Sequence, residues 1–410
     1  MRILLTANAS YVPPRGGATR SNLLWLEYMA ARGHACRVVA GALAESAAKR
    51  AQTAQEGTDR QALAERGVDI YEVAGHARQT AVLRRQIREF QPDWVLVSSE
   101  DLGHGLLREA HESAPGRVVY LAHTPQFFPF GPASWNPDPG ATELVTRAAA
   151  AVAIGQHTAA YICRHTGREA VVIHPPIYGR GPFPNLASFD TGLVTMVNPS
   201  AVKGISIFMA LAERFPACGF GVLPGWGTTA ADRAKLAAHT NIALLPNCRQ
   251  IAEFLGRTRI LLMPSLWYEG FGLTVMEAML HGIPVIASDA GGLVEAKMGT
   301  PFVVHAPAIE RYAPVFDEYS LPQPVLGPVD LRPWEEALRA LLTDRALYQR
   351  VSAASREAAL RFAGSLDGGR MPEFLQSLRP GEAVRERPSL AHLSPEKRTL
   401  LLHRARSRKP

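Results

Sequence analysis

The sequence predicts an α/β protein of two Rossmann-like domains that face each other across a cleft. Short apolar stretches alternate with amphipathic ones in both halves, which is typical of parallel sheets with crossover helices. Residues 175–184, dense in proline and glycine, separate the halves, and a new apolar stretch begins at Leu193. A length of 410 residues allows each half its own core.

The first half is predicted to hold a parallel sheet. Its strands are expected at residues 3–5, 36–40, 68–71, 94–97, 118–121, 151–154 and 170–173. We expect the first helix from Ser21 to Arg32, ended by Gly33. A helix at 82–90 carries several arginines, for which we favour a solvated face over membrane contact.

The second half repeats the pattern. Strands are expected at residues 193–197, 219–223, 242–245, 260–263 and 283–287, and helices at 334–342 and 348–362. No G-x-G-x-x-G follows the first strand of the chain, which argues against a dinucleotide oxidoreductase. Sheets of this kind bind ligands at the carboxyl ends of their strands, so the site is expected in the cleft.

Composition excludes several classes of protein. Hydrophobic residues make up 47% and charged residues 20%, which is ordinary globular composition. No apolar run approaches the ~18 to 20 residues of a membrane span, and the start of the chain reads as a strand and not as a signal peptide, so we expect a cytoplasmic protein. The four cysteines are scattered without C-x-x-C spacing and are expected to be buried thiols.

The net charge of +7 is concentrated at the end of the chain. Residues 383–410 hold eight Lys or Arg against Glu386 and Glu396, which gives +6. The body is close to neutral, so a nucleic-acid-binding face is not expected.

Residues 261–279 read as a buried strand, a glycine turn and the start of a helix. Gly270 and Gly272 let the backbone approach a ligand, and a helix that begins near Leu273 would direct free N–H groups at an anion. Glu269 on the turn and Glu277 in the helix would repel phosphates, so they are better suited to accept hydrogen bonds from sugar hydroxyls. The run therefore predicts a nucleotide-sugar site.

The same run resembles a known family. Glu269 and Glu277 reproduce the E-x7-E signature of retaining GT-B glycosyltransferases of the family 4 type, such as those of natural-product clusters. The flanking stretches 264–272 and 281–295 are also similar, and a looser resemblance covers residues 1–378.

The resemblance implies a domain organisation. Residues 1–178 would form the acceptor domain, 179–192 a linker and 193–354 the nucleotide-sugar domain. Residues 355–378 would cross back to the first domain, leaving 379–410 as a basic tail. Within the tail, 394–406 could form a helix similar to the linker helices of peptide and polyketide synthases, and a docking element and a frayed tail both remain open.

The resemblance also assigns the donor site. Glu277 would bind ribose and Glu269 the transferred sugar, while Lys203 would contact the diphosphate. Backbone contacts are expected from Gly16, Gly17, Gly270, Phe271, Gly272, Leu273 and Thr274. The family usually carries an arginine before this lysine, but the sequence has Asn198 in that region; Arg15 and Arg20 are possible replacements.

His123 ends a predicted strand and opens an aromatic loop. Similar enzymes often place a site histidine there, which can bind the sugar or help the acceptor lose its proton, although a structural histidine remains an alternative. The aromatic residues would be core or an acceptor pocket, and we favour an apolar acceptor. They are Phe127, Phe128, Phe130 and Trp135.

The resemblance thus implies a retaining hexosyl- or pentosyltransferase. Lys203, Glu269 and His123 are its catalytic candidates, and the donor expected first is a UDP-sugar. No histidine or D-x-D pattern offers metal ligands, so neither a metal nor a further cofactor is expected. A transferase for lipid or polysaccharide, a non-catalytic GT-B scaffold and a nucleotide-sugar epimerase are the alternatives.

Overall fold

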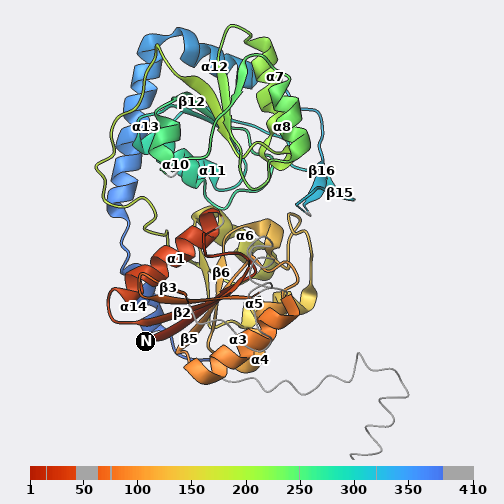
Figure 1. Cartoon of the computed structure of the whole chain (residues 1–410), viewed down its shortest axis with the longest axis vertical. Coiled ribbons are helices and arrows are strands. Elements are labelled where there is room, and N and C mark those ends of the chain that lie inside the picture. The colour runs from red at the N-terminus through yellow and green to blue at the C-terminus, as the bar shows by residue number, and fades with distance from the viewer. Residues whose placement is uncertain (15, 43–62, 74–75, 249, 320, 382–410) are drawn as a thin grey trace, which may run out of the picture.

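The computed structural model describes residues 1–14, 16–42, 63–73, 76–248, 250–319 and 321–381. Two α/β domains lie one above the other, each built on its own sheet (Figure 1). The prediction of two Rossmann-like domains is confirmed. The predicted tail helix at 394–406 and Arg15 lie outside the described residues.

The N-terminal domain contains a sheet in the order β3-β4-β2-β1-β5-β6-β7-β8, parallel except for β3. Its strands are β1 (Arg2–Ala7), β2 (Ala35–Gly41), β3 (Leu63–Glu65), β4 (Val68–Val73), β5 (Trp94–Ser98), β6 (Val118–Ala122), β7 (Ala150–Ala153) and β8 (Val171–Val172). The central strands β5, β6 and β7 are buried along their whole length, because helices cover both faces of the sheet.

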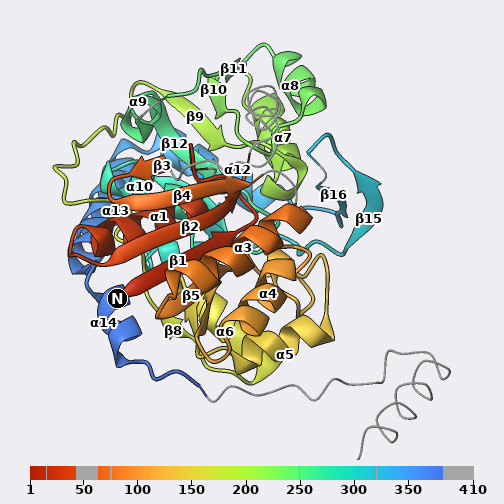
Figure 2. The same cartoon turned by 60° about the horizontal axis from the view of Figure 1, so that its bottom comes forward.

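The helices of this domain divide between the two faces of the sheet. They are α1 (Gly17–Ala30), α3 (His76–Phe90), α4 (Gly105–Ser113), η1 (Pro125–Phe127), α5 (Pro139–Arg147) and α6 (Gln156–Thr166). Helix α1 packs on one face, and α3 to α6 pack on the other (Figure 2). Helix α1 begins before the expected Ser21, because Gly17 and the residues after it already form its first turn.

The C-terminal domain has a parallel sheet in the order β11-β10-β9-β12-β13-β14. Its strands are β9 (Leu193–Val197), β10 (Phe220–Leu223), β11 (Ile242–Leu244), β12 (Thr258–Met263), β13 (Val285–Ser288) and β14 (Val303–Val304). Its helices are η2 (Ala201–Lys203), α7 (Ile205–Arg214), α8 (Ala230–Ala237), α9 (Ile251–Leu255), α10 (Leu273–Leu280), α11 (Leu293–Ala296) and α12 (Arg332–Thr343).

An antiparallel hairpin, β15 (Arg311–Phe316) and β16 (Pro322–Val325), extends from the C-terminal domain beside the gap between the domains (Figure 1). The sequence did not predict it. Both strands contain proline, which is depleted in strands and confined to edges, so the local signal for a strand is weak.

The chain returns to the N-terminal domain through α13 (Arg345–Ser365) and α14 (Arg370–Ser377). Met371 and Leu375 of α14 are fully buried in the cluster that also contains Ile3 and Trp25. Burying an apolar side chain of this size stabilises the fold by about 1.5–3 kcal/mol. The last helix therefore holds the end of the described chain against the first domain.

Candidate active site

A cavity of about 590 Å³ opens between the domains. The segments that line it directly follow strands β1, β5, β6 and β7 of one sheet and β9 to β12 of the other. The carboxyl ends of both sheets thus meet at one place, as expected for ligand sites of open parallel sheets. Predicted residues on its wall are Gly16, Gly17, His123, Phe127, Lys203, Glu269, Gly270, Phe271, Gly272, Leu273 and Thr274.

Helix α10 begins at the cavity wall. Gly272 precedes it with φ 116°, a conformation that favours glycine, and no side chain caps the helix. The N–H groups of its first turn therefore remain available to an anion. Gly270 must also be a glycine, because a Cβ there would lie 2.0 Å from the carbonyl oxygen of His123 in the other domain.

Lys203 and Glu269 form an ion pair inside the cavity. The Nζ atom lies 2.6 Å from Glu269 Oε1, and Ser265 Oγ donates to the same oxygen at 2.7 Å. Lys203 also lies over the ring of Trp267, 4.2 Å from its centroid. Both charged side chains are only 13–14% exposed, so each is fixed in place before a ligand arrives.

Glu277 lies one turn into α10, beside the cavity rather than on its wall. Burial raises the pKa of its carboxyl to about 7, and Arg20 of the other domain opposes this increase. The Arg20 Nη1 atom is 3.7 Å from Glu277 Oε1. The two glutamates of the E-x7-E pattern thus have different partners.

His123 is buried and uncharged. Its Nε2 lies 2.9 Å from Asn22 Oδ1, while the amide nitrogen of Asn22 donates to Tyr11 and Ser98. Since Asn22 Oδ1 can only accept, Nε2 carries the proton and Nδ1 is an acceptor. Burial lowers the pKa of the imidazole to about 3. His123 can therefore accept a hydrogen bond from a ligand hydroxyl, but it is a weak base.

The predicted aromatic acceptor group is divided by the fold. Phe128 and Phe130 are 0% and 5% exposed and pack with Tyr161 in the core of the N-terminal domain, which corrects the expectation that they contact an acceptor. Phe127 lines the cavity and packs edge-on against Trp135. The sequence could not distinguish Phe128 and Phe130 in the core from Phe127 at the cavity, because a loop has no periodic pattern of buried and exposed positions.

Trp135 connects the two domains without lining the cavity. Its ring centroid lies 5.7 Å from that of Trp267 and 5.6 Å from that of Tyr312 in β15. Trp226 continues this aromatic wall, at 5.9 Å from Trp267. No sequence pattern singles out Trp226, Trp267 and Tyr312, since they come from three separate segments.

Glu100 is a further cavity residue that the sequence did not single out. It follows β5, accepts from Ser98 Oγ at 2.7 Å, and burial raises the pKa of its carboxyl to about 7. The sequence feature that could have identified Glu100 is its position just after a predicted strand. A carboxyl group there gives the N-terminal domain an acceptor for hydroxyl hydrogen bonds.

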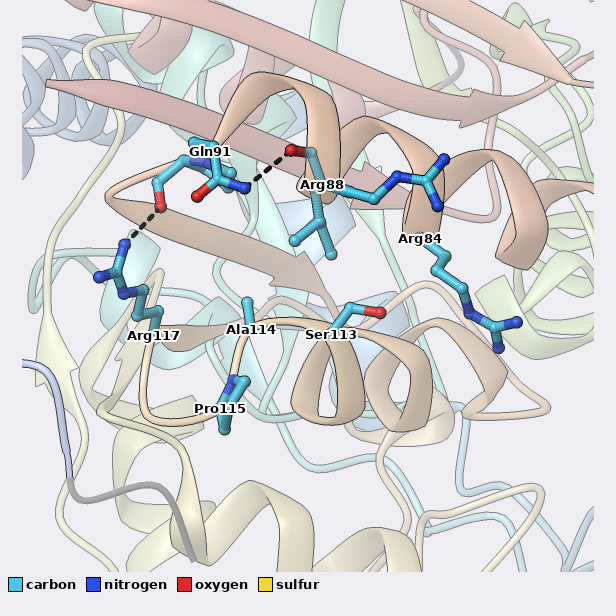
Figure 3. Close-up of a pocket in the computed structure, with 9 residues that line it drawn as sticks. Arg84, Arg88, Gln91, Ser113, Ala114, Pro115 and Arg117 are labelled. Atoms are coloured by element: carbon cyan, nitrogen blue, oxygen red, sulfur yellow. Dashed lines mark hydrogen bonds between the residues drawn. The ribbon is translucent and has the colours of Figure 1, made fainter. Parts of the chain in front are cut away.

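A second cavity, of about 460 Å³, lies between α3 and α4 (Figure 3). Arg84, Arg88 and Arg117 line it, but their guanidinium groups point in different directions. Arg84 pairs with Glu109 at 2.6 Å, and Arg117 donates to the carbonyl oxygen of Pro92 at 3.2 Å. Because the three groups do not converge on one anion, the solvated-face interpretation of this helix is favoured.

Within the described parts of the chain, no group of three or more His, Cys, Asp or Glu side chains is placed to hold a metal ion. Among the same residues, no helix is long and apolar enough to cross a membrane.

Comparison with solved structures shows which fold this is. Sucrose-phosphate synthase from Thermosynechococcus elongatus superposes with a TM-score of 0.69 at 14% identity, covering 92% of this chain and 98% of that one. HepE from Anabaena gives 0.65 at 15% identity, with 92% and 100% covered. WaaG gives 0.62 at 17% identity with the same coverage. At these identities the likeness shows the fold, which is GT-B.

Comparison of sequences shows which types of domain the chain carries. A relative from Klebsiella pneumoniae, named "Uncharacterized 42.6 kDa protein in cps region", is 28% identical over 123 residues. This match covers 30% of the present chain and 31% of that protein. Residues 15–178 match the model described as Glycosyltransferase Family 4, and residues 199–313 the model described as Glycosyl transferases group 1. The chain therefore carries GT-B glycosyltransferase domains of the family 4 and group 1 types.

Proposed function

We propose that this protein is a retaining glycosyltransferase that moves a sugar from a nucleoside-diphosphate sugar to a hydroxyl of an apolar small molecule. A UDP-sugar is the donor that we expect first. One observation carries the proposal. The Lys203–Glu269 ion pair and the uncapped start of α10 face the same interdomain cavity. A cation and free N–H groups suit the diphosphate, and a carboxylate suits the hydroxyls of the sugar.

The geometry supports separate roles for the residues of the cavity during sugar transfer. The acceptor oxygen bonds to the anomeric carbon as the bond to the diphosphate breaks, and the electron pair leaves with the nucleoside diphosphate. Lys203 and the first N–H groups of α10 stabilise that charge. His123, with a pKa of about 3, is a poor base, so the departing phosphate on the same face takes the acceptor proton.

Solved relatives support the choice of UDP as the first donor to test. HepE, which shares this fold, has been crystallised with UDP and glucose and with UDP-glucose. A further solved structure of this fold, described as "Trehalose-6-phosphate from E. coli", is bound with UDP-2-fluoro glucose.

The aromatic wall supports an apolar acceptor. Phe127, Trp226 and Trp267 line the cavity, and Trp135 with Tyr312 supports them from behind. Aromatic rings in such a position bind flat apolar surfaces. Trp135→Ala should raise KM for the acceptor more than for the donor.

A saccharide linked to a lipid or a polysaccharide is a second candidate acceptor. Glu100 favours it, because a buried carboxyl group on the acceptor side offers acceptors to hydroxyls. WaaG, which shares this fold, is a glycosyltransferase involved in lipopolysaccharide biosynthesis, which is consistent with this class. Flotation with liposomes of anionic and zwitterionic lipid separates the two, since a membrane-working enzyme should float with the vesicles.

The decisive test is a thermal-shift panel of UDP, GDP, ADP and their sugars, followed by an assay for nucleoside diphosphate release. A ligand at 100 times its Kd should stabilise the fold by about 2.7 kcal/mol. The nucleoside diphosphate of one base should produce a clear rise in Tm. The nucleotide-sugar with the same base should then release its nucleoside diphosphate in the assay. If none of these ligands raises Tm, the result would instead support a non-catalytic scaffold. Conversion of the donor in the absence of an acceptor would support an epimerase.

Metal independence is tested separately. Lys203 and the α10 N–H groups supply the positive charge in this proposal, so EDTA should leave kcat/KM unchanged. A large loss that Mg²⁺ or Mn²⁺ restores would contradict this mechanism.

A further inference from the structure

The lining of the cavity holds little positive charge. Among the described residues that line it, Lys203 is the only Lys or Arg, and Glu269 already neutralises it at 2.6 Å. Glu100 adds a second carboxyl group to the wall. A nucleoside diphosphate carries more than one negative charge, so a further cation from outside the lining would strengthen its binding.

The end of β9 cannot supply that cation. Asn198 follows this strand with φ 54° and is 8% exposed. Its Oδ1 accepts from the backbone N–H of Gly227 at 2.8 Å, and a Cβ at Gly225 would clash with it at 2.6 Å. The asparagine is fixed in a structural role and is neutral.

Helices α1 and α10 begin at the same point of the cleft, although they belong to different domains. A Cβ at Gly17, the first residue of α1, would lie 2.7 Å from Leu273 Cδ1 at the start of α10. One turn further along each helix, Arg20 faces Glu277, with 3.7 Å between Nη1 and Oε1. That distance is too long for a hydrogen bond, and Arg20 is 53% exposed, so its guanidinium N–H groups remain available.

Tyr178 provides a second, independent sign of a ligand at this place. Its hydroxyl is buried and has no hydrogen-bond partner within the described structure. Burial raises the pKa of this phenol, the Glu277 carboxylate raises it further and Arg20 lowers it, so both charged groups act on the hydroxyl. A buried hydroxyl without a partner costs free energy unless a ligand completes its hydrogen bonds.

We propose that Arg20 is the second diphosphate-binding cation and that it reaches the donor from the opposite domain. This inference rests on the proposed function. Lys203 would bind the diphosphate from η2 in the C-terminal domain, and Arg20 would bind it from α1 in the N-terminal domain. The phosphates of the donor would therefore join the two domains, so that binding of a diphosphate, and not of a nucleoside alone, would hold the cleft closed.

The experiment compares a nucleoside with its diphosphate. Affinities for UDP and uridine, or for the matching pair if the panel selects another base, are measured by calorimetry for wild type, Arg20→Gln and Arg20→Lys. Losing one charged hydrogen bond should weaken UDP about 10 to 100-fold. Uridine affinity should not change, and Arg20→Lys should restore part of the UDP affinity. Arg88→Gln, at an exposed arginine of α3 outside the cleft, controls for the change in net charge and should bind UDP normally.

Each remaining outcome is informative. Equal weakening of UDP and uridine would show that Arg20 only positions Glu277 for the ribose, and unchanged UDP affinity would show that it does not touch the diphosphate. Either result overturns the inference while leaving the proposed function intact. If wild-type protein binds no nucleoside diphosphate at all, the proposed function falls and the inference falls with it.

Discussion

At the scale of single residues, the proposed chemistry depends on side chains that are held by neighbours or buried, and that therefore behave differently from the same side chains in water. Lys203 is held by Glu269 and Trp267, while burial makes His123 neutral and raises the pKa of Glu277 to about 7. Ligand groups would therefore meet a preorganised site, which is the condition for strong electrostatic stabilisation.

Lys203→Ala tests the role of the pair directly. It removes a charged hydrogen bond worth roughly 1.5–3 kcal/mol, so kcat/KM should fall about 10 to 100-fold. The measurement is initial-rate kinetics with the donor that the panel identifies. Lys235→Ala, at an exposed position of α8, is the matched control and should leave kcat/KM unchanged. Equal kinetics for both variants would remove Lys203 from the site.

Glu277 should make stability depend on pH. Its pKa is 4.5 as a free group and about 7 when folded, so the protonated carboxyl stabilises the fold at low pH and this contribution is lost as pH rises towards 7. Glu277→Gln should therefore unfold in urea with a larger free energy than wild type at pH 8, by up to roughly 3 kcal/mol, and with a similar one at pH 4. Arg20 and Tyr178 are the charged or titratable groups coupled to this carboxyl.

The control for this pH measurement is Glu253→Gln, at an exposed position of α9. It should follow wild type at both pH values. If Glu277→Gln also follows wild type, the carboxyl is not destabilised by burial.

At the scale of elements, the glycine turn before α10 is tightly constrained. Gly270 approaches the carbonyl oxygen of His123, and Thr158 Oγ1 donates to the carbonyl oxygen of Gly270 at 3.0 Å. Backbone atoms of the two domains are therefore in direct contact at the wall of the cavity, where any added atom must separate them.

Gly270→Ala should disrupt this contact. The new Cβ would lie 2.0 Å from a backbone oxygen, so we expect a loss of about 1–3 kcal/mol in the free energy of unfolding and a large loss of activity. Denaturation and kinetics on the same preparation measure both. Gly364→Ala in α13 has no neighbour within 4 Å of its Cβ and should instead be neutral or slightly stabilising. A fully active Gly270→Ala enzyme would contradict the close approach.

At the scale of the whole molecule, the domains are joined by polar and aromatic contacts around the cleft. Glu295 of the C-terminal domain accepts from the backbone N–H groups of Gln156 and His157, at 2.7 and 3.3 Å, and so caps α6 of the other domain. The ring of His174 is tilted against Phe271 and edge-on to Phe362, with centroid distances of 5.1 and 5.0 Å. These contacts define the closed arrangement in which the donor residues meet.

Glu295→Ala should open the molecule. Loss of a carboxylate at a helix N-terminus removes up to roughly 2 kcal/mol of interdomain stabilisation, so the radius of gyration in X-ray scattering should increase and donor affinity should fall. Saturating donor should restore the compact form, because the ligand also joins the domains. Glu336→Ala, at an exposed position of α12, serves as control. An unchanged radius of gyration without ligand would show that other contacts suffice.

The sequence by itself determined the two parallel sheets, the start of α10 near Leu273 and the candidates Lys203, Glu269 and Glu277. It could do so because strand and helix periodicity and glycine turns are local properties of the chain. Only the tertiary structure separated Phe127 at the cavity from Phe128 and Phe130 in the core, and only it brought Glu100, Trp226 and Trp267 to the same wall.

The pairing of Arg20 with Glu277 was likewise decided by the fold. These residues are far apart in the chain and lie on helices of different domains, so no local pattern relates them. Burial sets their electrostatics, and burial is known only once both domains have packed. The sequence thus identified the chemical groups, whereas the packing of the two domains decided which of them face the ligand.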